Sequence, residues 1–199
     1  MPTSHTAFVL GNGVSRESIN LNELREHGTI YGCNAIYREF KCDHLIAVDT
    51  KMVLEIAKTN YQKYNSVWTN PSRLYKNIPN LNYFNPSKGW SSGPTALWYA
   101  SQNGHREIFI LGFDYKGIGE RQDRFNNIYA DTINYKKSNE PATFHGNWLR
   151  QTANVVKEHS IIKYTRVITP YNFCPSELNK FRNISNIMVE DFKKIFNLS

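Results

Sequence analysis

The chain has 199 residues, of which 40% are apolar and 21% charged, and 24 basic against 17 acidic residues give a formal net charge of +7. This composition is typical of a globular protein and excludes a disordered or collagen-like chain. No apolar run approaches the roughly 20 residues of a membrane-spanning helix, so we expect no membrane span. The positive net charge suits the binding of nucleotides or phosphates. The chain has no basic tail or arm, so the sequence gives no strong indication of a nucleic-acid partner. Three scattered cysteines without a CxxC pair favour a reducing compartment, and we expect a cytoplasmic protein.

In the first half of the chain, short apolar runs alternate with helical or turn-rich segments. The runs at 7–10, 29–32, 44–48, 66–68 and 81–84 predict short strands. Val53, Ile56 and Ala57 share one face of a helix that follows the third strand, and Thr50 can cap this helix.

The second half contains longer elements. Ser92 precedes a helical stretch with Pro94 in its first turn, and Asn103-Gly104 is a stop signal. A strongly apolar strand is predicted at 107–111, and a long polar loop follows from about 112 to 145. The remaining expected elements are a helix around 148–156, a strand at 166–168, and an amphipathic helix from about Asn186 to Phe196 with Ile187, Phe192 and Ile195 inward.

Strands that alternate with helices indicate a mostly parallel sheet with helices on both faces, which is a three-layer, Rossmann-like α/β fold. We expect residues 1–199 to form one domain. In such sheets, ligands bind beyond the carboxyl ends of the strands. The loops at those ends are therefore where we expect a functional site, with 112–145 as its long active-site loop.

The first of these loops carries two glycines. In Gly11-Asn12-Gly13-Val14-Ser15, the glycines let backbone N–H groups approach a phosphate, and a helix beginning near Ser15 would favour its negative charge. The segment is neither a P-loop nor a full GxGxxG, since Arg16 stands in place of the third glycine. It predicts either a phosphate-binding turn or an ordinary glycine turn.

Polar residues also end the next expected strands. Asn34 and Asp49 follow the second and third strands, and Ser92 and Gly93 begin a helix. Asparagine can donate to phosphate or ribose oxygens, aspartate can orient a sugar hydroxyl or hold a cation, and a helix N-terminus favours an anion. Each residue type is also common in turns and caps, and we expect Ser92 to cap its helix. Their convergence on one sheet edge favours a binding site.

The long loop carries Asp114, Tyr115 and Tyr129, and it ends at His145 before a helix. Tyrosine hydroxyls can donate to a leaving phosphate, and a neutral imidazole can act as general base. Aromatic packing is the alternative interpretation. Because HExxH, GxSxG, CxxC and HxE…PCxxC are absent, zinc hydrolases, α/β-hydrolases and zinc deaminases have no support.

Taken in order, these segments resemble the bacterial sialyltransferases of glycosyltransferase family 42. The matching segments are 11–15, 33–34, 92–100, 107–115, 129–132 and His145, within about residues 7 to 175. The resemblance implies a GT-A-like variant of the Rossmann-like fold. It also implies a metal-independent, inverting transfer of a sugar from a nucleotide-activated donor, a CMP-sugar, to a glycan or other hydroxyl acceptor, without a cofactor.

The resemblance further implies roles for individual residues. Asn12, Asn34, Ser92 and Gly93 would hold the nucleotide, Tyr129 would assist the leaving phosphate, and His145 would be the base. Tyr115 stands one place earlier than the family's second phosphate tyrosine, and Asp49 stands where an asparagine is expected. We group Tyr115 with the catalytic residues, and Gly11, Gly13, Ser15, Asp49 and Asp114 with the donor-binding residues.

Two other functions are compatible with the sequence. One is a pterin pyrophosphokinase-like enzyme of related fold that uses Mg-ATP, with Asp49 and Asp114 beside the cation. The other is a non-catalytic structural or binding component of a phage particle, because short proteins of this general look occur in tailed-phage genomes. A phage source would place the chain in the host cytoplasm or the virion. The expected protein partners are a second copy of the chain, in a homo-oligomer, or a phage particle.

Overall fold

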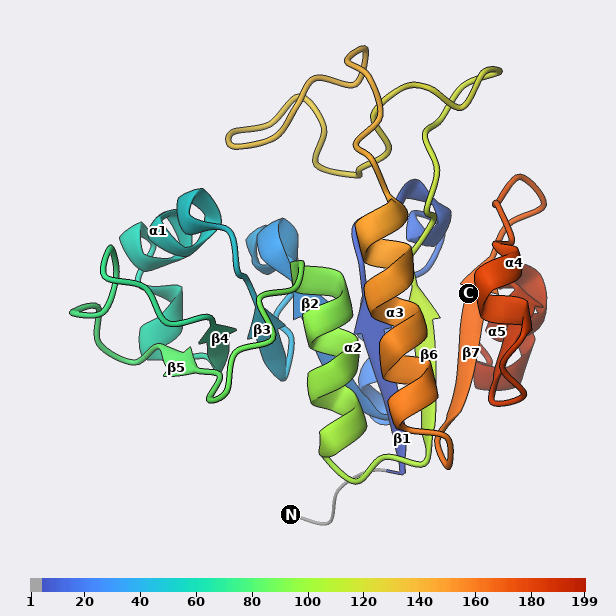
Figure 1. The fold of residues 1–199 in the computed structure, drawn as a ribbon, viewed down its shortest axis with the longest axis horizontal. Coiled ribbons are helices and arrows are strands. Elements are labelled where there is room, and N and C mark those ends of the chain that lie inside the picture. Colours follow the sequence, from blue (N-terminus) through green and yellow to red (C-terminus); the bar gives the residue numbers. More distant parts are fainter. Residues whose placement is uncertain (1–4) are drawn as a thin grey trace.

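The computed structural model describes residues 5–199, whose strands form one open, eight-stranded sheet (Figure 1). The strands are β1 (Thr6–Leu10), β2 (Thr29–Cys33), β3 (His44–Ile46), β4 (Val67–Thr69), β5 (Asn82–Tyr83), β6 (Glu107–Leu111), β7 (Lys163–Ile168) and β8 (Ile184–Met188). All neighbours are parallel, in the spatial order β5-β4-β3-β2-β1-β6-β7-β8. The expected parallel α/β sheet is confirmed.

Strand β1 lies in the middle of the sheet, between β2 and β6, and both of its faces are buried. Phe8 and Leu10 belong to one core cluster, whereas Ala7 and Val9 belong to the cluster on the other face. A strand covered on both faces must be apolar at every position, which explains the unbroken run at 7–10.

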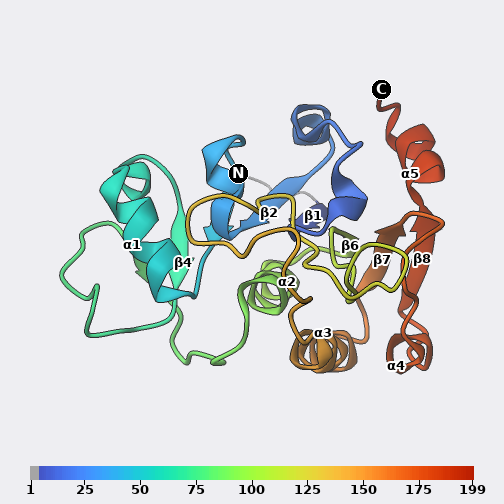
Figure 2. The same cartoon turned by 90° about the horizontal axis from the view of Figure 1, so that it is seen from above.

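Helices cover both faces of the sheet (Figure 2). One face packs against α1 (Thr50–Lys58), α5 (Val189–Phe196) and the short 3-10 helices η2 (Leu21–Glu26) and η3 (Asn34–Arg38). The other packs against α2 (Ser92–Gln102), α3 (Gly146–Glu158) and α4 (Ser176–Asn179). Single 3-10 turns η1 (Val14–Arg16) and η4 (Tyr61–Lys63) complete the elements. Within residues 5–199, none of the helices combines the length and hydropathy that crossing a bilayer requires.

The C-terminal segment differs from the prediction of one helix over 186–196. Its first part is β8, in which Ile187 pairs with Val167 of β7, and α5 begins only at Val189. Pairing with β7 gives the backbone of this segment its hydrogen-bond partners, and this tertiary contact overrides the helical spacing. The later start also decides which side of α5 faces the core. Phe192 is buried as expected, but Ile195 is 58% exposed.

The segment between β6 and α3 contains no helix or strand, only isolated bridges, and it lies above the carboxyl edge of the sheet (Figure 1). A side-chain clamp fixes its middle. Arg38 donates to both carboxylate oxygens of Glu55 at 2.7 Å, and also to Thr132 Oγ1 at 2.8 Å and the Ile133 carbonyl at 2.9 Å. Asn134 Nδ2 donates to the same carboxylate. The long loop is thereby fastened to η3 and α1.

Candidate functional site

A cleft of about 370 Å³ lies at the carboxyl edge of the sheet, where the strand order reverses between β1 and β6. The chain leaves β1 toward the η2 face and leaves β6 toward the α3 face. Such divergence opens a crevice at this point in parallel sheets. The cleft is lined by Gly11, Asn12, Gly13, Cys33, Asn34, Asp49, Ser91, Ser92, Gly93, Pro94, Gly112, Phe113, Asp114, Tyr115, Lys116, Phe125, Asn126, Asn127, Ala142, Thr143, His145 and Trp148. Ten of the twelve predicted site residues are therefore brought together, and Ser15 and Tyr129 are not among the lining residues.

The two loops at the reversal point approach each other closely. Gly11 and Gly13 donate backbone hydrogen bonds to the carbonyls of Leu111 and Gly112 at 2.8 and 2.9 Å. A Cβ at Gly13 would lie 2.5 Å from Asp114 Oδ2, and Gly112 adopts a φ of +69°. The glycines are thus required for the contact between the loops. The helix expected near Ser15 is only the single 3-10 turn η1, so this turn has no helix N-terminus to offer an anion.

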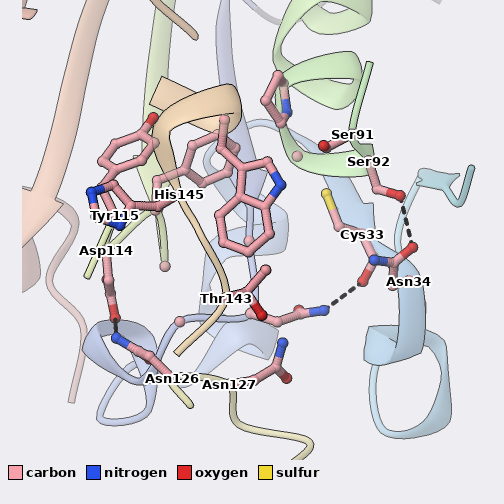
Figure 3. Close-up of a pocket in the computed structure, with 18 of the residues that line it drawn as sticks. Cys33, Asn34, Ser91, Ser92, Asp114, Tyr115, Asn126, Asn127, Thr143 and His145 are labelled. Atoms are coloured by element: carbon pink, nitrogen blue, oxygen red, sulfur yellow. Dashed lines mark hydrogen bonds between the residues drawn. The ribbon is translucent and has the colours of Figure 1, made fainter. Parts of the chain in front are cut away.

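Asp114 fastens these two loops together. Its carboxylate accepts the backbone N–H of Ser15 at 3.2 Å and a short bond from the Ser15 hydroxyl. It also accepts Asn126 Nδ2 at 3.0 Å (Figure 3). Asn126 Oδ1 in turn accepts the Val14 N–H at 3.0 Å. Ser15 therefore does not line the cleft, but it holds Asp114 in place through two hydrogen bonds. The Asp114 carboxylate is already engaged by three donors.

Two buried arginines, which no sequence motif singles out, also shape the cleft. Arg16 is 3% exposed and donates through Nε to the Gly11 carbonyl at 2.6 Å. Arg166 is 1% exposed and donates to the Phe113 carbonyl and the Phe173 carbonyl, both at 2.8 Å. The sequence around 166 does not mark this arginine as buried, since β7 (Lys163–Ile168) reads KYTRVI and contains other polar residues. A charged residue is exceptional in a core unless it is hydrogen-bonded, as Arg166 is here.

One wall of the cleft carries Asn12, Asn34 and the start of α2. Asn12 Nδ2 donates to the Cys33 carbonyl at 3.0 Å. Asn34 Oδ1 accepts the Ser92 hydroxyl at 2.8 Å, as a dashed line in Figure 3 shows. Ser92 is not the N-cap of α2 as expected, because Ser91 occupies that position. The Ser92 hydroxyl instead links Asn34 to the backbone N–H of Val48.

The N-terminus of α2 also faces the cleft. The first N–H groups of a helix have no acceptor within it. Here they belong to Ser92 and Gly93, and both residues line the cleft. Pro94 follows without an N–H group. These two N–H groups, with the positive end of the helix dipole, form a site suited to a phosphate.

His145 immediately precedes α3 and is partly exposed in the cleft. Figure 3 shows His145 and Tyr115 on one side, with Asn34 and Ser92 across the cleft from them. Phe144 stacks on the imidazole at a centroid distance of 6.2 Å, and the Phe173 ring approaches edge-on at 6.2 Å. No residue within 5–199 hydrogen-bonds to the imidazole. Its nitrogens are therefore available to a substrate hydroxyl.

The two predicted phosphate tyrosines direct their hydroxyls elsewhere. The Tyr115 ring lines the cleft, but its hydroxyl donates to Thr152 Oγ1 at 2.7 Å, and burial raises the pKa of this phenol. The Tyr129 hydroxyl lies outside the cleft, where it donates to Glu39 and accepts from Arg16. Burial, and next the Glu39 carboxylate, raise the pKa of Tyr129. Both tyrosine hydroxyls thus bind other side chains of the protein, and neither is directed at a phosphate in the cleft.

Of the two carboxylates in the cleft, only that of Asp49 is unengaged. Asp49, and not Thr50 as expected, occupies the N-cap position of α1, because the helix already includes Thr50. The Asp49 side chain makes no capping hydrogen bond and is exposed to solvent at the cleft. The surrounding walls nevertheless exclude enough water to raise the pKa of this carboxyl by desolvation. Within residues 5–199, no group of three or more His, Cys, Asp or Glu side chains is arranged to hold a metal ion.

Comparison with known proteins gives a fold relationship. No model of a known protein family matches the chain, and no curated protein matches it. Among solved structures, the chain is similar to the sialyltransferase CstII from Campylobacter jejuni in complex with a substrate analogue, cytidine-5'-monophosphate. The TM-score is 0.54, the sequence identity is 15%, and the match covers 99% of both chains. At this identity the likeness establishes the fold alone. It lends no support to a phage source.

Proposed function

We propose that the chain is a metal-independent, inverting glycosyltransferase that takes its sugar from a CMP-activated donor. The observation that carries the proposal is that two different groups face each other across one cleft. They are the free N–H groups at the start of α2 and the His145 imidazole, which has no hydrogen-bond partner among residues 5–199. The similar fold of a sialyltransferase in complex with CMP supports a nucleotide in this crevice.

The proposed reaction is a single displacement. His145 accepts the proton of the acceptor hydroxyl while that oxygen bonds to the anomeric carbon. The bond from this carbon to the phosphate oxygen breaks, and CMP leaves with the electron pair. The N-terminus of α2, with its two N–H groups and the positive end of the helix dipole, stabilises the leaving phosphate. Because protein groups supply this stabilisation, turnover is expected to persist in EDTA.

Replacing His145 by Ala tests the assignment. A general base contributes about 10²–10⁴-fold, so H145A should lower the rate of CMP release from a CMP-sugar in a mixture of glycan acceptors by at least about 10²-fold. Its affinity for CMP should stay within about twofold, because the α2 N-terminus is intact.

His5→Ala is the matched control, since the exposed His5 precedes β1 at the opposite edge of the sheet. It should behave like the wild type. Retained turnover in H145A would contradict the role of His145, and tight binding of Mg-ATP without binding of CMP would favour the pyrophosphokinase-like alternative instead.

A further inference from the structure

Asp49 is an ionisable group in the cleft for which the fold supplies no partner. Within residues 5–199 its carboxylate receives no hydrogen bond and forms no ion pair. Desolvation raises the pKa of this carboxyl. Asp114, the other carboxylate in the cleft, is satisfied by three donors. Asp49 is therefore poised to accept hydrogen bonds from a ligand.

Asn34 supplies the complementary group. Its Oδ1 is occupied by the Ser92 hydroxyl, whereas its Nδ2 has no partner among the described residues. Asn34 and Asp49 both line the main cleft and also an adjoining cavity of about 330 Å³, bounded further by Lys51, Asn134 and Tyr135. A donor and an acceptor thus stand where the two spaces meet, next to the phosphate-binding end of α2.

We propose that Asp49 is a specificity-determining residue, which with Asn34 binds hydroxyl or amide groups of the transferred sugar and excludes a sugar carboxylate from this position. The inference rests on the proposed function and narrows the donor to a nucleotide ester of a sugar that presents hydrogen-bond donors to Asp49. A sugar hydroxyl can donate to the carboxylate and accept from Asn34 Nδ2. A second carboxylate in contact with Asp49 would be repelled, because two like charges at contact distance repel each other even at an exposed position where water screens them.

A matched pair of ligands tests the charge selection. The pair is CMP-N-acetylneuraminic acid and the analogue in which its carboxylate is replaced by a carboxamide. Calorimetry would compare their affinities, relative to that of CMP, in the wild type, Asp49→Asn and Asp191→Asn. The last variant removes the same charge from the exposed face of α5, where Asp191 pairs with Lys194.

The wild type and Asp191→Asn should bind the carboxamide about tenfold more tightly than the carboxylate. Asp49→Asn should bind the carboxylate and the carboxamide equally, once each affinity is expressed relative to that of CMP for the same variant. This comparison isolates the coupling between the charge of residue 49 and the charge of the ligand. A wild-type preference for the carboxylate, no preference, or a preference that persists in Asp49→Asn would overturn this inference alone. Failure of CMP to bind the wild type would overturn the proposed function together with it.

Discussion

Removing the Ser15 hydroxyl should loosen the contact between the β1 and β6 loops. Ser15→Ala deletes one oxygen, which donates to the buried carboxylate of Asp114, and leaves the backbone N–H of residue 15 and Asn126 as donors. A hydrogen bond to a charged group contributes about 1.5–3 kcal/mol, so the free energy of unfolding should fall by about 2 kcal/mol. For a chain of this size that corresponds to a decrease in Tm of about 4–8 °C.

Urea denaturation followed by far-UV circular dichroism measures this change. Ser185→Ala is the control, because Ser185 is exposed on β8 and its hydroxyl has no partner among the described residues. It should change stability by less than about 0.5 kcal/mol. If the two variants lost equal stability, the Ser15–Asp114 hydrogen bond would not hold the loops together as inferred.

Two further perturbations address the rest of the molecule. Burial lowers the pKa of His44, so the folded state binds fewer protons there than the unfolded state, and stability should fall as the pH drops below about 6.5. His44→Gln should flatten part of that decline in urea titrations between about pH 7 and 5, and an unchanged slope would refute the assignment. Arg38→Gln should remove the bonds to Thr132 and Ile133 and leave only the Asn134–Glu55 bond of the clamp. Hydrogen exchange should then become faster at the amides of 132–134 and stay unchanged in β1. Unaltered protection of the loop would show that the clamp does not hold it.

The strands at the centre of the sheet are predictable because their burial on both faces demands continuous apolar runs. The runs at 7–10 and 107–111 form β1 and β6. The position of the cleft follows from the same prediction, since loops after adjacent parallel strands meet at one edge. For this reason residues as distant in sequence as Asn12, Asn34 and His145 can be grouped from the sequence alone.

The remaining features depend on tertiary contacts that no local pattern encodes. The Tyr115 hydroxyl turns to Thr152 because α3 passes behind the loop, and the Tyr129 hydroxyl is taken by Glu39, 90 positions away in the sequence. The role of Arg166 is not predictable, because a charged residue in a strand suggests exposure, whereas here it is buried and binds loop carbonyls. Strand β8 escapes prediction because its pairing with β7, and not its own spacing, sets its conformation.

The central claim, that the cleft between β1 and β6 binds the nucleotide by its phosphate, is tested most directly by amide chemical shifts during a CMP titration of ¹⁵N-labelled protein. The account predicts saturable shifts that are largest at Ser92 and Gly93, with others at Gly11, Gly13 and Asn34. The amides of β8 should remain unaffected. No saturable shift at millimolar CMP, or shifts centred away from α2, would contradict it.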